Sequence, residues 1–579
     1  MLSGCGNNPQ PAKSEARAGN ATYSRDGRLP QDVMVSCTVT RDSFDTWFEG
    51  GKAVENGRIK PANSVTFPHT NNCSFYQWSE QMFLWITSPT AGGGTVLQSP
   101  LFYDVTPAVN KTRMLVPHKA GQPLRAIAHI DQTGPNRLPV IIDKQGRLYE
   151  VERHVRADNT KALLKSEAGK LVEVDHAETT ADGTHIFKDK AGEVIPHPRA
   201  VIMHKVNQAR IVQAIVTDKN EDVYLDNMGQ EIQTETGQAT NDALMAQNGS
   251  MVYYILSVND VFAYYMTAVK QKEMNGAQFP TTAAERDRIC AFARKNGATL
   301  PDSNALAVEL KTSWVEAKGL ADLGSYITAD AVVPTYNTTD KCHWIVNGEK
   351  TVKLALIGMH VVGSLAGHPE MSWATFEHIN NAPNAKYAYL DSTGKVKVVP
   401  QENGKGWLLS ENAADDGYNI SHMKVAGDTV SCTKVSRSIS ASNTLMVLPW
   451  GSAWDSVTNG EDKSSAASNS EVISINNAIR NMLQGKDVRK NYLLIGATWT
   501  DGGVAPNGRC YSITDTVAGV AIGTSVLANS TMETYFQKTT TSCLFCHSNN
   551  SLAPGALSHV FDDLKPLNLL PAAPASIKK

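Results

Sequence analysis

The spacing of bulky apolar side chains predicts a long helix near the start of the chain. Within residues 73–86, Phe75, Trp78, Met82 and Trp85 recur every three or four positions, which is the period of one helix face. Thr-Ser-Pro and three successive glycines follow and end the pattern. An aromatic stripe of this kind belongs to a protein core more often than to the wall of a cofactor site, so we interpret this helix as structural.

Later segments show either helical or strand periodicity. A helix is expected over 283–295, because Thr282 can cap its start and Gly297 can end it. Asp260 is expected to cap a helix that follows a buried strand over 251–258. The other predictions are strands over 306–315, 353–362 and 491–499, helices over 473–483 and 526–537, a helix beginning at Pro369 with His368 at its cap, and an exposed loop over 455–470.

Three short segments repeat with a period of 23 residues. Their glycines are Gly146, Gly169 and Gly192, and each lies between two strand-like stretches. This arrangement predicts an array of β-hairpins, with a weaker fourth copy at 219–225. We interpret the array as an insertion into a larger body.

These patterns together predict an α+β fold with a large strand-rich body, several helices, the inserted β-hairpin array and a C-terminal helical segment. With 579 residues, 41% of them hydrophobic, the chain can bury a substantial core. Only 19% of the residues are charged and the net charge is −3, so no basic face exists for nucleic acid. The expected domains are a flexible tether over 1–30, the main body over 31–119 and 206–520, the hairpin insert over 120–205, and the C-terminal segment over 521–579.

The C-terminal segment contains Cys543-Leu544-Phe545-Cys546-His547, the attachment motif of a c-type haem. Two cysteines three positions apart can bond to the two vinyl groups of one porphyrin, and the following histidine can bind the iron. The motif therefore predicts one covalent haem c, with Cys543 and Cys546 as attachment sites and His547 as the proximal iron ligand.

Other interpretations of the motif are a zinc half-site, a redox CxxC and chance. Zinc would require a second Cys/His pair at ligand spacing, and none stands nearby in the sequence. A redox CxxC would follow a strand in a βαβ unit, whereas this motif lies among Thr, Ser and Asn. The sequence also lacks the HExxH, GxSxG, Walker A and dinucleotide-binding patterns.

The opposite face of such a haem needs residues from earlier in the chain. Residues 358–378 are the richest source of histidine, methionine and carboxylate side chains, and His368, Glu370 and His360 are our candidates for catalytic groups. Arg480, Arg489 and Lys490 can pair with haem propionates, although a solvated basic face explains them better. The candidate distal ligands are His368, His360, Met371, His378, His559 and Met532.

The cysteines and the N-terminus favour export. Leu2-Ser3-Gly4-Cys5 matches a bacterial lipobox with Cys5 as the lipidated residue, although only Met1 precedes it. Apart from Cys5 and the two cysteines of the haem motif, six remain, which allows up to three disulfides of unknown connectivity in an oxidising compartment. These six are Cys37, Cys73, Cys290, Cys342, Cys432 and Cys510.

The chain resembles a family of large, mostly uncharacterised bacterial proteins known only as cytochrome c family. The similarity covers most of residues 70–565, without the 23-residue repeats, and it implies haem and export but no substrate. The resemblance implies no functional residues other than Cys543, Cys546 and His547. The segments that carry it are WSEQMFLWITSP, MAQNGSMVYYILSVNDVFAYYMT, FPTT with the helix after it, ELKTSWVEA, GMHVVGSLAGHPEMSWATFEH, NYLLIGATWT, and LANSTMETYFQ before CLFCH.

Three functional hypotheses follow from the sequence. The first is an exported monohaem cytochrome that passes single electrons to a redox partner protein or a small redox molecule, held at the membrane by a lipid anchor only. The second is a haem-dependent oxidoreductase, peroxidase- or oxygenase-like, with an open distal site. The third is a surface binding lipoprotein whose haem is structural or sensory. In each case the expected location is the periplasm or outer membrane of a bacterium.

Overall fold

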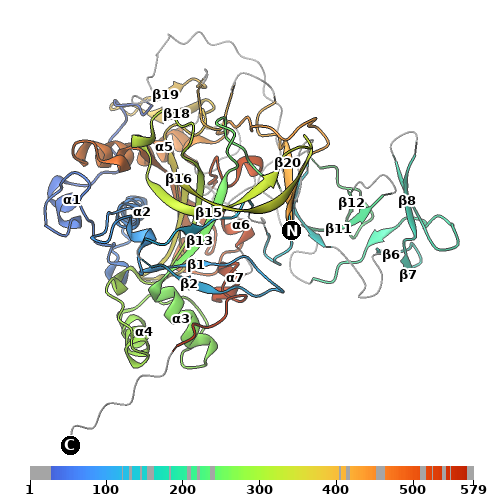
Figure 1. Cartoon of the computed structure of the whole chain (residues 1–579), viewed down its shortest axis with the longest axis horizontal. Helices are drawn as coiled ribbons and strands as arrows, with labels where there is room; N and C mark the ends of the chain where they lie inside the picture. Colours follow the sequence, from blue (N-terminus) through green and yellow to red (C-terminus); the bar gives the residue numbers. More distant parts are fainter. Residues whose placement is uncertain are drawn as a thin grey trace, which may run out of the picture.

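The computed structural model is a mixed α+β protein with a strand-rich body (Figure 1). This confirms the fold class predicted from the sequence, apart from a helical C-terminal segment. The structure describes residues 28–119, 121–129, 133–143, 147–152, 162–180, 184–204, 210–217, 222–234, 242–402, 406–411, 417–451, 463–508, 517–524, 526–537, 543–547 and 550–569.

A large sheet organises the body. Neighbouring strands along its main path pair antiparallel. In spatial order this path is β2 (Leu115–Pro117), β1 (Phe102–Val105), β13 (Tyr253–Asn259), β14 (Val308–Glu316), β16 (His343–Leu365), β17 (His368–His378), β22 (Tyr492–Thr500) and β23 (Ala521–Gly523). Branches add β15 (Thr328–Asn337), β3 (Leu124–Arg125), β20 (Met423–Ala426) and β21 (Thr429–Cys432).

The helix predicted to begin at Pro369 is wrong, because this segment is strand β17. Ala366 and Gly367 form the tight turn between β16 and β17, and Gly367 has a φ of +76°, which favours glycine. Every residue of β17 is buried. A strand buried on both faces shows no alternation of polar and apolar residues, so its sequence period resembles that of a helix.

Helix α2 (Asn72–Ile86) covers the sheet and confirms the predicted aromatic helix. The ring of Phe75 stacks on Trp499 of β22 with centroids 3.7 Å apart, and Phe83 stacks on Phe376 of β17 at 4.3 Å. Trp78, Met82 and Trp85 are also buried. The aromatic stripe therefore belongs to the core, as its pattern indicated.

Two further helices, α3 (Asp260–Lys270) and α4 (Ala283–Lys295), pack together at one end of the sheet (Figure 1). The predicted bounds of α4 are confirmed, and Thr282 and Glu285 form a capping box. The predicted cap of α3 is wrong by one residue. Asn259 caps the helix by accepting a hydrogen bond from the backbone N–H of Phe262.

The structure corrects two other sequence predictions, and in both segments buried polar side chains make hydrogen bonds. Helix α5 (Lys463–Met482) includes residues 463–470, which we expected to be a loop, and Asn469 donates a hydrogen bond to the carbonyl of Ala388. Residues 526–537 form a loop that ends in one 3-10 turn, although we expected a helix. Glu533 there accepts a hydrogen bond from the N–H of Asn529, so side chains replace helical partners. The Ala388 strand, β18 (Tyr387–Leu390), pairs with β19 (Val396–Val399).

The repeat region forms three small sheets beside the body (Figure 1). Gly169 and Gly192 occupy turns with φ near +80°, and Gly229 forms an equivalent turn beyond the predicted insert. Gly146 and part of the copy at 219–225 lie outside the described residues. The sheets are β12 (Asp222–Leu225), β11 (Ile211–Val216), β5 (Leu148–Glu152) and β4 (Val140–Ile142); β10 (Arg199–Ala200), β6 (Leu163–Lys165) and β7 (Leu171–Glu173); and β8 (His176–Thr179) with β9 (His185–Lys188).

Two disulfides are present among the described residues. Cys37, four residues before helix α1 (Arg41–Trp47), is bonded to Cys73 in the first turn of α2, and Cys342 is bonded to Cys432, beside the pairing of β16 with β21. Cys290 is a free thiol, so the six cysteines do not all pair as three bridges. Cys5 and Cys510 lie outside the described residues.

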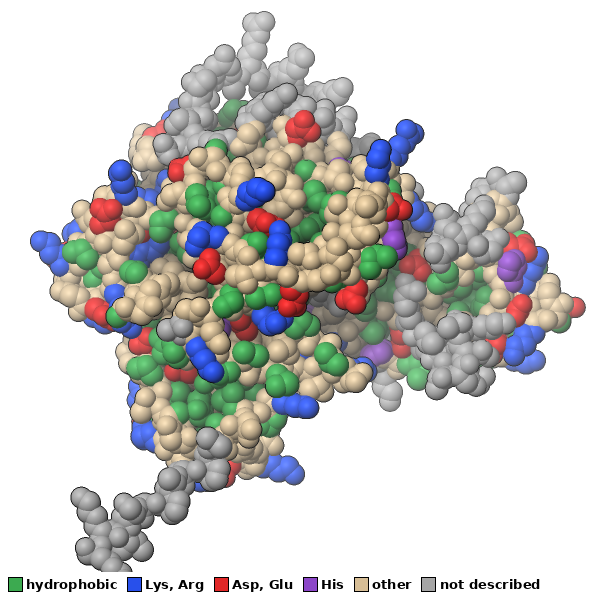
Figure 2. All heavy atoms as spheres, in the orientation of Figure 1, with side chains coloured by type: hydrophobic (Ala, Val, Ile, Leu, Met, Phe, Trp, Pro, Cys, Tyr) green, Lys and Arg blue, Asp and Glu red, His purple; other side chains and the backbone are tan. Residues whose placement is uncertain are grey.

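The surface mixes both signs of charge. Lysine and arginine side chains are interspersed with aspartate and glutamate over the face shown in Figure 2. No helix in the described part of the chain is long and apolar enough to cross a membrane.

Candidate functional site

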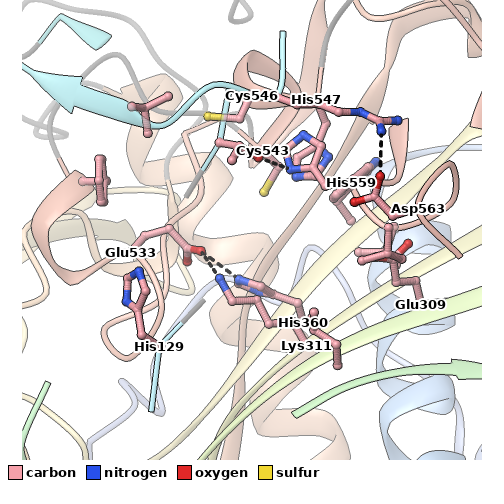
Figure 3. Close-up of a pocket in the computed structure, with 18 of the residues that line it drawn as sticks. His129, Glu309, Lys311, His360, Glu533, Cys543, Cys546, His547, His559 and Asp563 are labelled. Atoms are coloured by element: carbon pink, nitrogen blue, oxygen red, sulfur yellow. Dashed lines mark hydrogen bonds and ion pairs between the residues drawn. The ribbon is translucent and has the colours of Figure 1, made fainter. Parts of the chain in front are cut away.

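A cavity of about 430 Å³ lies between the large sheet and the C-terminal segment (Figure 3). Three adjacent strands supply one wall. In the antiparallel register, Lys311 of β14 lies opposite His360 of β16, while Val362 of β16 lies opposite both Glu309 of β14 and Trp373 of β17. Directly paired residues project from the same sheet face, and all five line the cavity.

The CxxCH motif forms the facing wall. Helix α6 (Cys543–Cys546) is a single turn, and the N–H of His547 donates to the carbonyl of Cys543 at 3.0 Å. This turn places both thiols and the imidazole on the cavity. In Figure 3 the two sulfurs and the His547 ring lie together at one side of the space.

Burial determines the state of the two thiols. It raises the pKa of Cys543 well above its usual range and that of Cys546 to about 12. Redox-active and metal-binding cysteines need accessible thiolates with lowered pKa values. The environment of Cys543 and Cys546 therefore suits neutral sulfur, as in a thioether.

His547 is oriented as a metal ligand would be. Its Nδ1 lies 2.5 Å from the carbonyl oxygen of Leu557, at the end of α7 (Pro554–Leu557). A carbonyl only accepts hydrogen bonds, so Nδ1 carries the hydrogen and Nε2 keeps its lone pair. Burial, opposed by the Leu557 carbonyl, lowers the pKa of His547 to about 4, which keeps the imidazole neutral.

Aromatic rings fix the plane of His547. Its ring centroid is 4.3 Å from Trp373, and it stacks on His559 with centroids 4.0 Å apart and planes 16° apart. The Nδ1 of His559 lies 2.8 Å from the hydroxyl of Thr133. His559 is therefore beside the His547 imidazole and not across the cavity from it, where we expected it as a distal ligand.

A polar cluster lies opposite the motif. His360 Nε2 is 3.0 Å from Glu533 Oε1, and Lys311 Nζ is 3.9 Å from the same oxygen. Figure 3 shows these three residues and His129 across the cavity from Cys543 and His547. Of these four residues, only His360 was among the candidates from the sequence.

The sequence contains one signal for this cluster that we did not use. Glu309 and Lys311 lie two positions apart in a strand whose other residues are largely apolar and buried. Such alternation places both charges on one face of a sheet strand. A pair of charges on the interior face of a buried strand indicates a polar cavity or a partner from another segment.

The remaining distal and catalytic candidates do not line the cavity. His368 Nδ1 lies 2.8 Å from Glu370 Oε1, so these two are together but elsewhere, and Trp373 Nε1 donates to the Glu370 carbonyl. Met371 and Met532 pack in the hydrophobic core. His378 stacks on Tyr326 at 3.8 Å, and burial lowers its pKa to about 3.

The expected propionate partners are also elsewhere. Arg489 is buried in an ion pair with Asp487 at 2.6 Å, Arg480 donates to the Lys490 carbonyl, and Lys490 donates to the Gly485 carbonyl. The arginines that line the cavity are instead Arg113 and Arg137, both beside Asp563.

The fold and site thus define a mixed α+β protein with a CxxCH motif on a large internal cavity. Comparisons of the chain with protein-family models, with curated proteins and with solved structures find no match. Among the described side chains, no group of three or more His, Cys, Asp or Glu is arranged to hold a metal ion.

Proposed function

We propose that this chain is an exported monohaem c-type cytochrome, with its haem bound covalently in the cavity by Cys543 and Cys546. His547 supplies the proximal iron ligand through Nε2. The observation that carries the proposal is the hydrogen bond from His547 Nδ1 to the Leu557 carbonyl. Ligating histidines almost always donate their second ring N–H in this way, which fixes the tautomer and the ring orientation.

The surroundings support the same group. The cavity volume falls within the range of about 300–1,000 Å³ that is typical of cofactor sites. Much of its wall is apolar, with Leu256, Val362 and Trp373 among the lining residues, while Arg113, whose Nε makes no hydrogen bond among the described residues, supplies a cation for a carboxylate group. A c-type haem combines this apolar body with two carboxylates.

The geometry favours a haem-dependent oxidoreductase with an open distal site over a carrier of electrons alone. Across the cavity from His547, the cluster of His360, Glu533 and Lys311 supplies polar groups that can act on a bound molecule. The haem supplies redox chemistry when bound, and the chain supplies a neutral proximal imidazole, a cavity wall and polar groups on the far side.

Single-electron transfer to a redox partner protein or small redox molecule is the second candidate function. The specific observation in its favour is a second imidazole on the cavity, that of His129, which lies near Glu533 and across the space from His547. The disulfides support export to an oxidising compartment. A lipid anchor at Cys5, in the periplasm or at the outer membrane, remains part of the proposal.

Absorption spectra of the oxidised and reduced protein, with and without carbon monoxide, separate the two candidates. With an open distal site, the reduced protein is expected to bind carbon monoxide and change its spectrum. A low-spin spectrum that carbon monoxide leaves unchanged would contradict the oxidoreductase and establish a sixth protein ligand, as an electron carrier requires.

A further inference from the structure

The cluster of Glu533, His360 and Lys311 is built around one carboxylate. Glu533 Oε2 accepts the N–H of Asn529 at 3.0 Å, and Oε1 faces His360 Nε2 at 3.0 Å and Lys311 Nζ at 3.9 Å. Burial alone would raise the pKa of Glu533, but His360, Lys311 and the Asn529 N–H outweigh it and lower the pKa. Glu533 is therefore ionised at neutral pH.

An ionised carboxylate accepts hydrogen bonds and cannot donate them, so His360 Nε2 carries a hydrogen. In the neutral imidazole, Nδ1 then keeps the lone pair. His360 lines the cavity and its side chain is 16% exposed. Glu533 thus binds the Nε2–H of His360 and leaves Nδ1 as the basic nitrogen. A general base that is oriented by a carboxylate has this arrangement.

Lys311 complements this base. The Lys311 side chain also lines the cavity, and the carboxylate oxygen nearest to its Nζ among the described residues, at 3.9 Å, lies beyond hydrogen-bonding distance. The ring of Tyr254 is 5.9 Å away. The ammonium group therefore has hydrogen-bond donors to offer to a ligand in the cavity. A base beside a cation suits a molecule that separates into a proton and an anion, because the base accepts the proton and the cation stabilises the anion.

We propose that this cluster binds small weak acids HX on the haem face opposite His547, with hydrogen peroxide as the oxidant of this class. His360 Nδ1 accepts the proton as the H–X bond breaks, the bonding electron pair remains on X⁻, and Lys311 stabilises that anion. This inference rests on the haem of the proposed function. It names the substrate class, since only a molecule with an acidic proton uses the base and the cation together.

Cyanide, added as its weak acid, is the probe for this site. Its dissociation constant from the oxidised protein is measured by absorption for the wild type, His360→Ala and Lys311→Met. We expect His360→Ala to weaken binding about 10²-fold, the lower end of the contribution of a positioned acid–base group, because the variant has no base to hold the proton. The affinity of the reduced protein for carbon monoxide, which has no proton to give, is expected to change much less than that for cyanide, and binding of carbon monoxide shows that the variants are folded.

His343→Ala is the matched control, because His343 lies on the same strand β16 at its exposed end. It is expected to leave both affinities at the wild-type value. Glu533→Gln is expected to weaken cyanide binding in the same direction as His360→Ala, because it removes the carboxylate that fixes the tautomer. Equal cyanide affinities in wild type and His360→Ala overturn this inference alone. Absence of haem bands from the wild type overturns the proposed function and this inference together.

Discussion

Replacing His547 by glycine is expected to abolish the native absorption spectrum of the matured protein while the haem stays attached. The two thioether bonds to Cys543 and Cys546 do not involve the imidazole, whereas the iron loses its proximal ligand. The wild-type ring is fixed by the Leu557 carbonyl and by Trp373 and His559. These three contacts hold the imidazole in one orientation.

Free imidazole makes this test specific. The glycine variant leaves a space of the correct shape between Trp373 and His559, so added imidazole is expected to restore a spectrum close to that of the wild type. His343→Ala, in which an exposed histidine is removed, serves as the control and should keep the native spectrum. An unchanged spectrum in His547→Gly would refute the assignment of the proximal ligand.

Removing the Cys342–Cys432 disulfide is expected to destabilise the protein by about 4–5 kcal/mol, since the bridge closes a loop with a sequence separation of 90. The bridge joins the chain just before β16 to the end of β21, so it also holds the paired register of these strands. The Cys37–Cys73 bridge, with a separation of 36, is expected to contribute about 3–4 kcal/mol.

Chemical denaturation of the double serine variants measures these two effects. The variant without Cys342 and Cys432 should unfold at the lower denaturant concentration of the two. Cys290→Ser is the control, because Cys290 is a free thiol, and its midpoint should stay near that of the wild type. Equal midpoints for all three variants would show that the bridges do not constrain the unfolded chain.

Local signals allowed much of the fold to be predicted from the sequence. The bounds of α4 follow from Thr282, Glu285 and the glycine after the helix, all within a few residues of the element they define. The aromatic helix α2 follows from its apolar period in the same way. These signals need no knowledge of the rest of the chain.

The wrong predictions depend on contacts with distant segments. Strand β17 is covered on both faces, so its apolar residues give no strand period. The start of α5 is rich in serine and asparagine, a composition that indicates a loop. Its helical structure depends on contacts such as the hydrogen bond from Asn469 to Ala388 of β18, which the local sequence does not show. In both cases tertiary burial overrides the local pattern.

The candidate site also has a part that the sequence predicts and a part that depends on the fold. Cys543, Cys546 and His547 are adjacent in sequence, and the chemistry fixes their spacing, so the motif alone indicated them. His360, Lys311 and Glu533 come from three separate segments that meet only in the folded sheet. His368 and Glu370 were favoured because residues 358–378 are rich in histidine, methionine and carboxylate side chains, but the strands place these two away from the cavity.

Mass spectrometry of the peptide that contains Cys543 and Cys546 tests the central claim most directly. The protein is exported and matured in a bacterium that carries the cytochrome c attachment machinery. It is then digested without reduction of its disulfides. The account predicts that this peptide carries the mass of one haem, bound through both sulfurs, and that the peptide containing Cys290 carries none. Unmodified thiols at Cys543 and Cys546 in correctly exported, disulfide-bonded protein would contradict the account.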